Sequence, residues 1–110
     1  MTVYEPGDIV LVAFPFSSGS SVKARPAVVV LDTGDSDVVV ARITTQLHHT
    51  PWDVLLADWQ AAGLLAPSVV RVHKLATLEK NLVHRQLGSL QPTDRTAVAA
   101  VLQQTMGNWK

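Results

Sequence analysis

Arg25 is the first residue whose type and position suggest chemistry, because it stands between a polar loop and an apolar run. Pro26 follows it and favours an extended backbone at Arg25. A guanidinium held at the mouth of a strand can make two parallel hydrogen bonds to phosphate oxygens. Arg25 is therefore a candidate phosphate ligand, although the pattern also fits a surface arginine whose stem covers apolar atoms.

The segment Arg42–Gln46 carries polar side chains at every second position. Alternate residues of a strand share a face, so Arg42, Thr44 and Gln46 are expected together, opposite Ile43. Such a face is poor material for a core. On the pattern alone it is typical of a solvated strand face.

A third segment pairs a second arginine with a histidine. In a strand, Arg71 and His73 share one face, while Val70 and Val72 point the other way. A nearby cation favours the neutral, basic form of imidazole, which can transfer protons near neutral pH. The alternative is a pair of exposed polar residues on an edge strand.

Other kinds of site find little support. His48 and His49 are adjacent, so in a strand they point to opposite faces and do not easily share a metal ion. The chain has no cysteine, which excludes disulfides, thiolate zinc sites and cysteine nucleophiles. We predict no metal site and no cofactor. Trp52, Trp59 and Trp109 could stack on bases, but tryptophan is more often a core or interface residue.

Short strands must position these residues. Ala27–Leu31 is a continuous apolar run, the pattern of a strand buried on both faces. Trp59–Ala62 reads as a short helical turn closed by Gly63, and Thr77–Leu82 as a turn or short helix. The expected strands are Ile9–Phe14, Ala27–Leu31, Val38–Ile43, Val54–Leu56, Ser68–Val72 and Gln86–Leu90.

The C-terminal region alone predicts a full helix. Pro92 or Thr93 can start it, Asp94 lies in the first turn where the helix dipole favours an acid, and Gly107 can end it. Its apolar face consists of Ala97, Val98, Val101 and Leu102. Many short strands and one terminal helix favour a small, strongly bent β-barrel, because a parallel α/β fold would need crossover helices.

Length and composition fit one packed domain over residues 1–110, with 47% hydrophobic and 16% charged residues. Nine basic residues balance nine acidic ones, so net charge argues neither for nor against a nucleic-acid partner. This balance makes an obligate partner or a homodimer plausible. We expect a cytoplasmic protein, because no apolar run approaches the ~20 residues of a membrane span and no secretory signal is visible.

The order of the motifs resembles the MazF/PemK family of toxin endoribonucleases over nearly the whole chain. The matching pieces are Gly7–Val10, a Ser/Gly loop, Arg25–Val30, Ile43–Gln46, Ser68–Val72 and Lys74–Lys80. The resemblance implies a mainly β fold, an SH3-like barrel of the plasmid-maintenance-toxin type with a C-terminal helix. It also implies a homodimeric toxin of a type II toxin–antitoxin system that cuts single-stranded RNA without a metal and is blocked by a cognate antitoxin.

The family's functional residues carry over one at a time. The resemblance makes Arg25 the phosphate ligand and proton donor, Thr44 a ligand of the scissile phosphate, and Arg71 a second cleavage arginine. Some relatives have an aspartate where this chain has His73, so the general base is either His73 or Arg25 acting with solvent. The RNA-binding contacts expected around this centre are Ser20, Lys23, Arg42, Gln46 and His48.

Two alternatives stay open. A same-fold, CcdB-like toxin would poison DNA gyrase by protein contact, although such toxins use a C-terminal Trp-Gly-Ile tail and this chain ends Gly107-Asn108-Trp109-Lys110. A non-catalytic barrel that binds RNA or peptide would keep the apolar strands. It would not need Arg25, Thr44 and Arg71 to converge.

Overall fold

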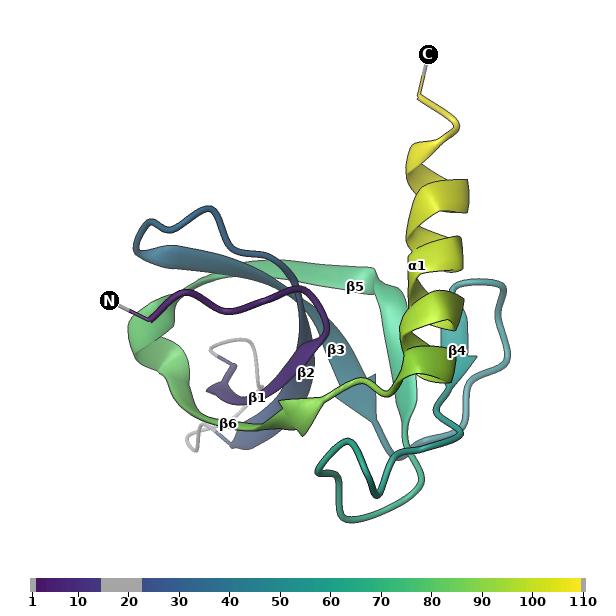
Figure 1. Ribbon diagram of the computed structural model, residues 1–110, viewed down its shortest axis with the longest axis horizontal. Coiled ribbons are helices and arrows are strands. Elements are labelled where there is room, and N and C mark those ends of the chain that lie inside the picture. The colour runs from purple at the N-terminus through teal and green to yellow at the C-terminus, as the bar shows by residue number, and fades with distance from the viewer. Residues whose placement is uncertain (1, 15–22, 110) are drawn as a thin grey trace.

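The computed structural model describes residues 2–14 and 23–109, whose strands form one six-stranded antiparallel sheet of order β4-β5-β3-β2-β1-β6 (Figure 1). A 3₁₀ turn, Lys80–Leu82, connects the last two strands, and helix α1 (Pro92–Met106) ends the fold. The strands are β1 (Asp8–Ala13), β2 (Ala24–Leu31), β3 (Asp37–Thr44), β4 (Asp53–Leu55), β5 (Val69–Glu79) and β6 (Val83–Ser89).

The curled sheet has a core on each face. Ala27 and Val29 of β2 belong to an inner core with Val38 and Val40, whereas Val28 belongs to a second core on the helix side. These three β2 residues are at most 2% exposed, so the prediction of a strand buried on both faces is confirmed for Ala27–Val29, whereas Val30 is half-buried and Leu31 is 50% exposed. The sheet is curled, with α1 on its outer side (Figure 1), and apolar side chains are buried both inside the curve and beneath α1.

Strand β5 is longer than predicted and is sharply irregular. Ala41 of β3 pairs with Leu75, yet the next residue, Arg42, pairs with Arg71, so residues 72–74 oppose nothing on β3. The prediction of a turn or short helix over Thr77–Leu82 is wrong for its first three residues, which continue the strand. Their strand state comes from pairing with the start of β3, a contact that a local sequence window does not contain.

The turn before β5 confirms the local prediction. Ala62 N donates to Asp58 O at 3.1 Å, and Gly63 ends the turn with a φ of +98°. A side chain at Gly63 would also collide with the backbone, because a Cβ there would lie 2.2 Å from Leu87 O. Glycine is therefore required for both the conformation and the close approach of this turn to β6.

Helix α1 begins at Pro92, as predicted, and Gly107 caps its end. Val98 is buried, and Ala97, Val101 and Leu102 pack against the helix-side core, which confirms the expected apolar face. No helix within residues 2–14 and 23–109 is long and apolar enough to span a bilayer.

Asp94 does more than occupy a favourable place in the helix dipole. It is only 2% exposed, and its two carboxylate oxygens accept the backbone N–H groups of Ala57 and Asp58, each at 2.9 Å. The carboxylate therefore joins the first turn of α1 to the segment that follows β4.

Replacing Asp94 with alanine is expected to destabilise the protein by about 2–4 kcal/mol, because two backbone donors lose charge-assisted hydrogen bonds. Urea unfolding measures this as a lower midpoint. Thr93→Ala, an exposed change in the same turn, is the control and should alter stability by less than about 0.5 kcal/mol. Equal midpoints for the two variants would contradict the role given to Asp94.

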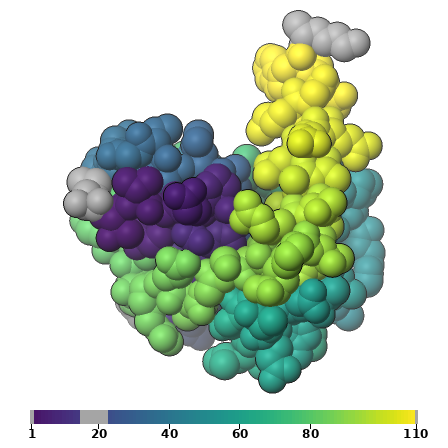
Figure 2. Space-filling view, in the orientation of Figure 1, coloured from purple at the N-terminus to yellow at the C-terminus, as the bar shows by residue number. Residues whose placement is uncertain are grey.

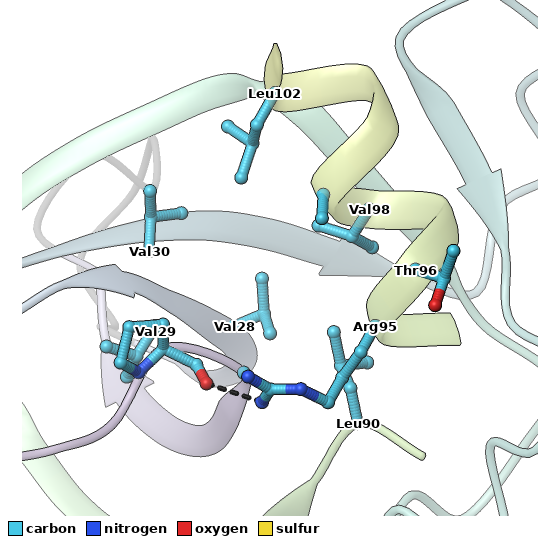
Figure 3. A pocket seen from close by; sticks show the side chains of 11 residues that line it. Val28, Val29, Val30, Leu90, Arg95, Thr96, Val98 and Leu102 are labelled. Carbon is cyan, nitrogen blue, oxygen red and sulfur yellow. Dashed lines mark hydrogen bonds between the residues drawn. The ribbon is translucent and has the colours of Figure 1, made fainter. Parts of the chain in front are cut away.

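A groove of about 270 Å³ separates α1 from the N-terminal segment and β2. Figure 2 shows α1 standing away from the body of the molecule beside it, and Figure 3 shows the apolar lining, including Val28, Val30 and Leu102. Arg95 crosses one side and donates to Pro6 O at 2.6 Å. None of the predicted site residues lines this groove.

Candidate active site

Strand register brings three charged residues into one row. Residues directly opposite in an antiparallel pair share a face, and Arg42 of β3 pairs with Arg71 of β5, which pairs with Asp53 of β4. Arg42 follows Val38 and Val40 in alternation, so this row continues the inner face of the sheet beyond its apolar core. The two arginines lie on the same face as adjacent cations.

Arg25 and Thr44 lie at the same end of the same face. Ala27 is the last residue of β2 paired with β3, and its partner is Arg42. Arg25 stands two residues before Ala27, and Thr44 stands two residues after Arg42, so the antiparallel register carries both side chains to one end. Arg25 is exposed and Thr44 is half-buried. Polar residues of β2, β3 and β5 thus lie toward the same end of the inner face.

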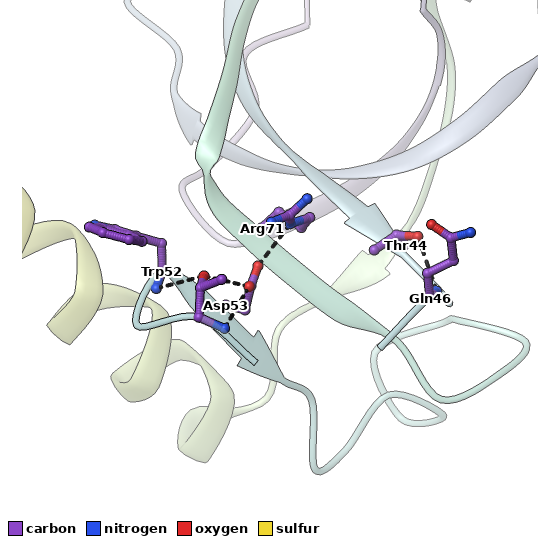
Figure 4. Close-up of polar contacts among 6 residues, drawn as sticks. Thr44, Gln46, Trp52, Asp53 and Arg71 are labelled. Carbon is purple, nitrogen blue, oxygen red and sulfur yellow. Dashed lines mark hydrogen bonds and ion pairs between the residues drawn. The ribbon is translucent and has the colours of Figure 1, made fainter. Parts of the chain in front are cut away.

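Gln46 departs from the prediction, because β3 ends at Thr44 and Gln46 lies in a bend beyond it. The hydroxyl oxygen of Thr44 accepts the N–H of Gln46 at 3.1 Å, as Figure 4 shows. This local bond turns the chain out of the sheet, a known alternative to strand pairing for threonine. With its oxygen engaged as an acceptor, the Thr44 hydroxyl keeps its proton to donate to a ligand.

A buried carboxylate holds Arg71. The Nε of Arg71 donates to Asp53 Oδ1 at 2.9 Å (Figure 4), and the Asp53 side chain is only 1% exposed. Asp53 Oδ2 accepts the N–H of Thr50 at 3.0 Å and its hydroxyl at 2.5 Å. Burial opposes ionisation of Asp53, but the hydrogen bonds from Thr50 and Arg71 outweigh it and hold the pKa at about 2. The pair is therefore ionic at neutral pH.

Sequence reasoning missed Asp53. Its partner is 18 residues away, and β4 is only three residues long, so no periodic pattern linked the two. The one available signal was an acid at the start of a short apolar run, which is too common to indicate a site.

His73 shares the Arg71 side of β5, as predicted, since Val70 and Val72 are buried in the helix-side core. Its ring centroid lies 5.9 Å from that of Trp52, with 51° between the planes. His73 is an exposed residue, yet partial desolvation of its ring and the charge of Arg71 lower its pKa, with smaller lowering effects from Lys74 and His48 and an opposing effect from Asp53. The neutral imidazole expected from the sequence is thus favoured, with desolvation as the larger cause.

The remaining predicted residues differ in how closely they approach this centre. His48 is half-buried and close enough to His73 to influence its charge. Arg42 and Lys23 are exposed, Lys23 immediately before β2. Ser20 lies outside the described residues. Trp52 is 44% exposed, so it is not the core residue that tryptophan usually is.

Metal ligands are not grouped in this part of the fold. Over residues 2–14 and 23–109, no three His, Cys, Asp or Glu side chains lie together in a way that could hold a metal ion. The arrangement of the site is instead one of cations, a hydroxyl and a neutral imidazole. Such a set can bind an anionic ester and move a proton.

Comparison with known proteins connects this geometry to a family. The sequence model described as "PemK-like, MazF-like toxin of type II toxin-antitoxin system" matches residues 5–106. No sequence among the curated proteins compared matches this chain.

Several solved structures share the fold, which confirms the predicted mainly β barrel with a C-terminal helix. An endoribonuclease in complex with its cognate antitoxin from Mycobacterial species has a TM-score of 0.76 at 21% identity, covering 96% of this chain and 97% of its own. Mycobacterium tuberculosis toxin MazF-mt6 has a TM-score of 0.74 at 24% sequence identity, and the match covers 94% of this chain and 97% of that one. MazF from Deinococcus radiodurans has a TM-score of 0.75 at 19% sequence identity, and the match covers 97% of this chain and 99% of that one.

Proposed function

Because this chain belongs to the PemK-like, MazF-like toxin family of type II toxin–antitoxin systems, we propose that it is an endoribonuclease that cuts single-stranded RNA. The observation that supports the proposal is the strand register, which directs Arg25, Thr44 and Arg71 toward one end of one sheet face. A non-catalytic barrel would not need that convergence. The solved structures with this fold include proteins named as endoribonucleases, which supports the same reading.

RNA supplies its own nucleophile for this reaction. The 2′-hydroxyl beside the scissile phosphate attacks phosphorus, the bond from phosphorus to the 5′-oxygen breaks, and a 2′,3′-cyclic phosphate and a 5′-hydroxyl result. The protein need only align the phosphodiester, accept one proton, supply a donor to the leaving oxygen and stabilise negative charge. These tasks require no metal ion.

Each proposed catalytic residue takes one of these tasks. The guanidinium of Arg25 binds the phosphate and acts as the donor to the 5′-oxygen, and the Thr44 hydroxyl donates to a second phosphate oxygen. Arg71 adds positive charge from β5. His73 accepts the proton of the 2′-hydroxyl, which the lowered pKa supports because it leaves the ring neutral at neutral pH.

The wider groove and the partners belong to the same proposal. Contacts to the RNA chain come from Ser20, Lys23, Arg42, Gln46 and His48. We propose one toxin domain over residues 1–110 that acts as a homodimer in the cytoplasm. An antitoxin is the expected protein partner, since one solved structure of this fold contains a cognate antitoxin.

The direct test is to incubate the purified protein with a long single-stranded transcript in EDTA and map the cuts by primer extension. Discrete cuts with 5′-hydroxyl and 2′,3′-cyclic phosphate ends, identified by mass spectrometry, are expected. Intact RNA together with inhibited DNA supercoiling by gyrase would instead indicate the protein-binding toxin. RNA that is bound but never cut would indicate a non-catalytic barrel.

The pH dependence of cleavage tests the role of His73. The rate should rise with pH as the imidazole loses its proton and should level off below the ordinary histidine pKa, because the pKa of His73 is lowered. His73→Gln should slow cleavage by about 100-fold at neutral pH and remove this rise. His84→Gln, at an exposed position on β6, is the control and should leave the profile unchanged. If the cleavage rate of His73→Gln still rises with pH as in the wild type, a group other than His73 is the general base.

A further inference from the structure

Asp53 is a nearly fully buried carboxylate to which the proposed reaction assigns no task. It lies at the start of β4, an edge strand of three residues, and its side chain is 1% exposed. A buried charge is costly unless it is paired and hydrogen-bonded, so its partners indicate what it does.

The turn before β4 fixes this carboxylate in place. Thr50 donates to Asp53 Oδ2 through both its N–H and its hydroxyl, and Asp53 N donates back to Thr50 O at 3.1 Å. The Thr50 hydroxyl oxygen also accepts the N–H of Trp52 at 3.3 Å. Together these bonds leave Oδ1 as the free edge of the carboxylate, directed at β5 (Figure 4).

Oδ1 engages Arg71 through Nε, which determines the direction of the guanidinium. Paired backbones set Asp53 opposite Arg71, and the Nε–Oδ1 distance is 2.9 Å. Within residues 2–14 and 23–109, no acceptor is hydrogen-bonded to Nη1 or Nη2 of Arg71. A guanidinium held by Nε presents its two terminal nitrogens as a fixed fork, the edge that matches two phosphate oxygens.

The pair also offsets a repulsion within the sheet. Arg71 lies directly opposite Arg42, and like charges opposite each other across strands repel. A neighbouring anion offsets this repulsion and holds the flexible Arg71 side chain in one direction. Asp53 supplies that anion on the far side of Arg71 from Arg42.

We propose that Asp53 is a positioning residue, which holds Arg71 by Nε so that its terminal nitrogens face the phosphate of bound RNA. This inference rests on the proposed ribonuclease function and deepens it. Asp53 itself touches no substrate. Its effect on cleavage should therefore depend entirely on Arg71, whereas a merely structural Asp53 would act whether Arg71 is present or not.

A double-mutant cycle separates these two roles. Single-turnover cleavage of a short RNA at saturating protein should slow by about 10- to 100-fold in Asp53→Ala and by about 100-fold in Arg71→Ala. The double variant should be no slower than Arg71→Ala within about twofold. Asp35→Ala, which removes an exposed acid from the turn before β3, controls for the changed net charge and should retain the wild-type rate.

Two results would overturn the positioning role. One is a double variant whose loss equals the product of the two single losses, and the other is Asp53→Ala that cuts at the wild-type rate. If the wild-type protein leaves all RNA whole, the proposed function fails first and the positioning role fails with it, so the two failures are distinguishable.

A second measurement covers the case in which Asp53→Ala does not fold. In ¹⁵N-arginine-labelled protein, the Nε–H resonance of Arg71, identified by its absence in Arg71→Lys, should exchange slowly with water. Asp53→Asn keeps the size of the side chain but removes its charge, and it should speed that exchange by about tenfold while slowing cleavage less than alanine does. Exchange that is unchanged in Asp53→Asn would contradict the inferred contact.

Discussion

Arg25→Ala is expected to slow RNA cleavage by at least about 100-fold, because removing a charged donor aimed at the transition state typically costs two to three powers of ten. The fold should survive the change. Arg25 is exposed, and its strand pairs with β1 through backbone groups opposite Val12. Single-turnover kinetics on one cleavable RNA give the rate, and urea unfolding should show a stability change within about 0.5 kcal/mol.

Two further variants separate geometry from charge at Arg25. Arg85→Ala removes an exposed arginine from β6, which also pairs with β1, and should change the rate by less than about threefold. Arg25→Lys keeps the charge but loses the planar fork, so its rate should fall between those of wild type and alanine. A well-folded Arg25→Ala protein with undiminished cleavage would refute the role of Arg25.

The location of the candidate site was predictable because it follows from strand periodicity. The apolar run Ala27–Val29 identified β2, and alternation along β3 and β5 assigned Thr44 and Arg71 to polar faces before any pairing was known. Arg25 entered as a candidate because of its place at the mouth of β2. These are local patterns with a period of two, and burial on one side strongly constrains them.

The parts that escaped prediction depend on contacts between distant segments. Thr77–Glu79 look like residues of a turn until β3 is placed beside them, and only the register shown by the structure reveals that residues 72–74, which include His73, have no partner on β3. The sequence predicted that Asp94 lies in the first turn of the helix, where the dipole favours an acid. It did not predict the hydrogen bonds of Asp94 to Ala57 and Asp58, which lie more than 35 residues away. In each case the deciding partner lies outside any local window.

Gln46 illustrates a different limit. Continuing the alternation of β3 puts it on the same face as Thr44, yet the Thr44 hydroxyl captures the Gln46 N–H and ends the strand. The same side chain can therefore extend a polar face or terminate it, depending on a local bond that competes with strand pairing. Because β3 ends at Thr44, Gln46 does not extend the polar face, and the polar strand residues at this end are Arg25, Thr44 and Arg71.

Removing a single 2′-hydroxyl from the RNA should have the largest effect of all. With a 2′-deoxy sugar on the 5′ side of the scissile phosphate, the internal nucleophile is gone, and cleavage at that position should fall by at least about 10⁴-fold. Mass spectrometry of the products from matched oligonucleotides measures the loss. The same substitution one nucleotide further along the chain, away from the reacting ribose, is the control and should leave the cut intact.

The deoxy oligonucleotide should still bind, because the groups proposed to hold the phosphate do not touch the missing hydroxyl. It should therefore compete with cleavable RNA at a concentration within a few-fold of the substrate's own affinity. Continued cutting at the deoxy position would mean that water, and not the ribose, attacks phosphorus. In that case His73 would have to activate a water molecule, no cyclic phosphate would form, and the reaction assigned to Arg25 and Thr44 would need a different nucleophile.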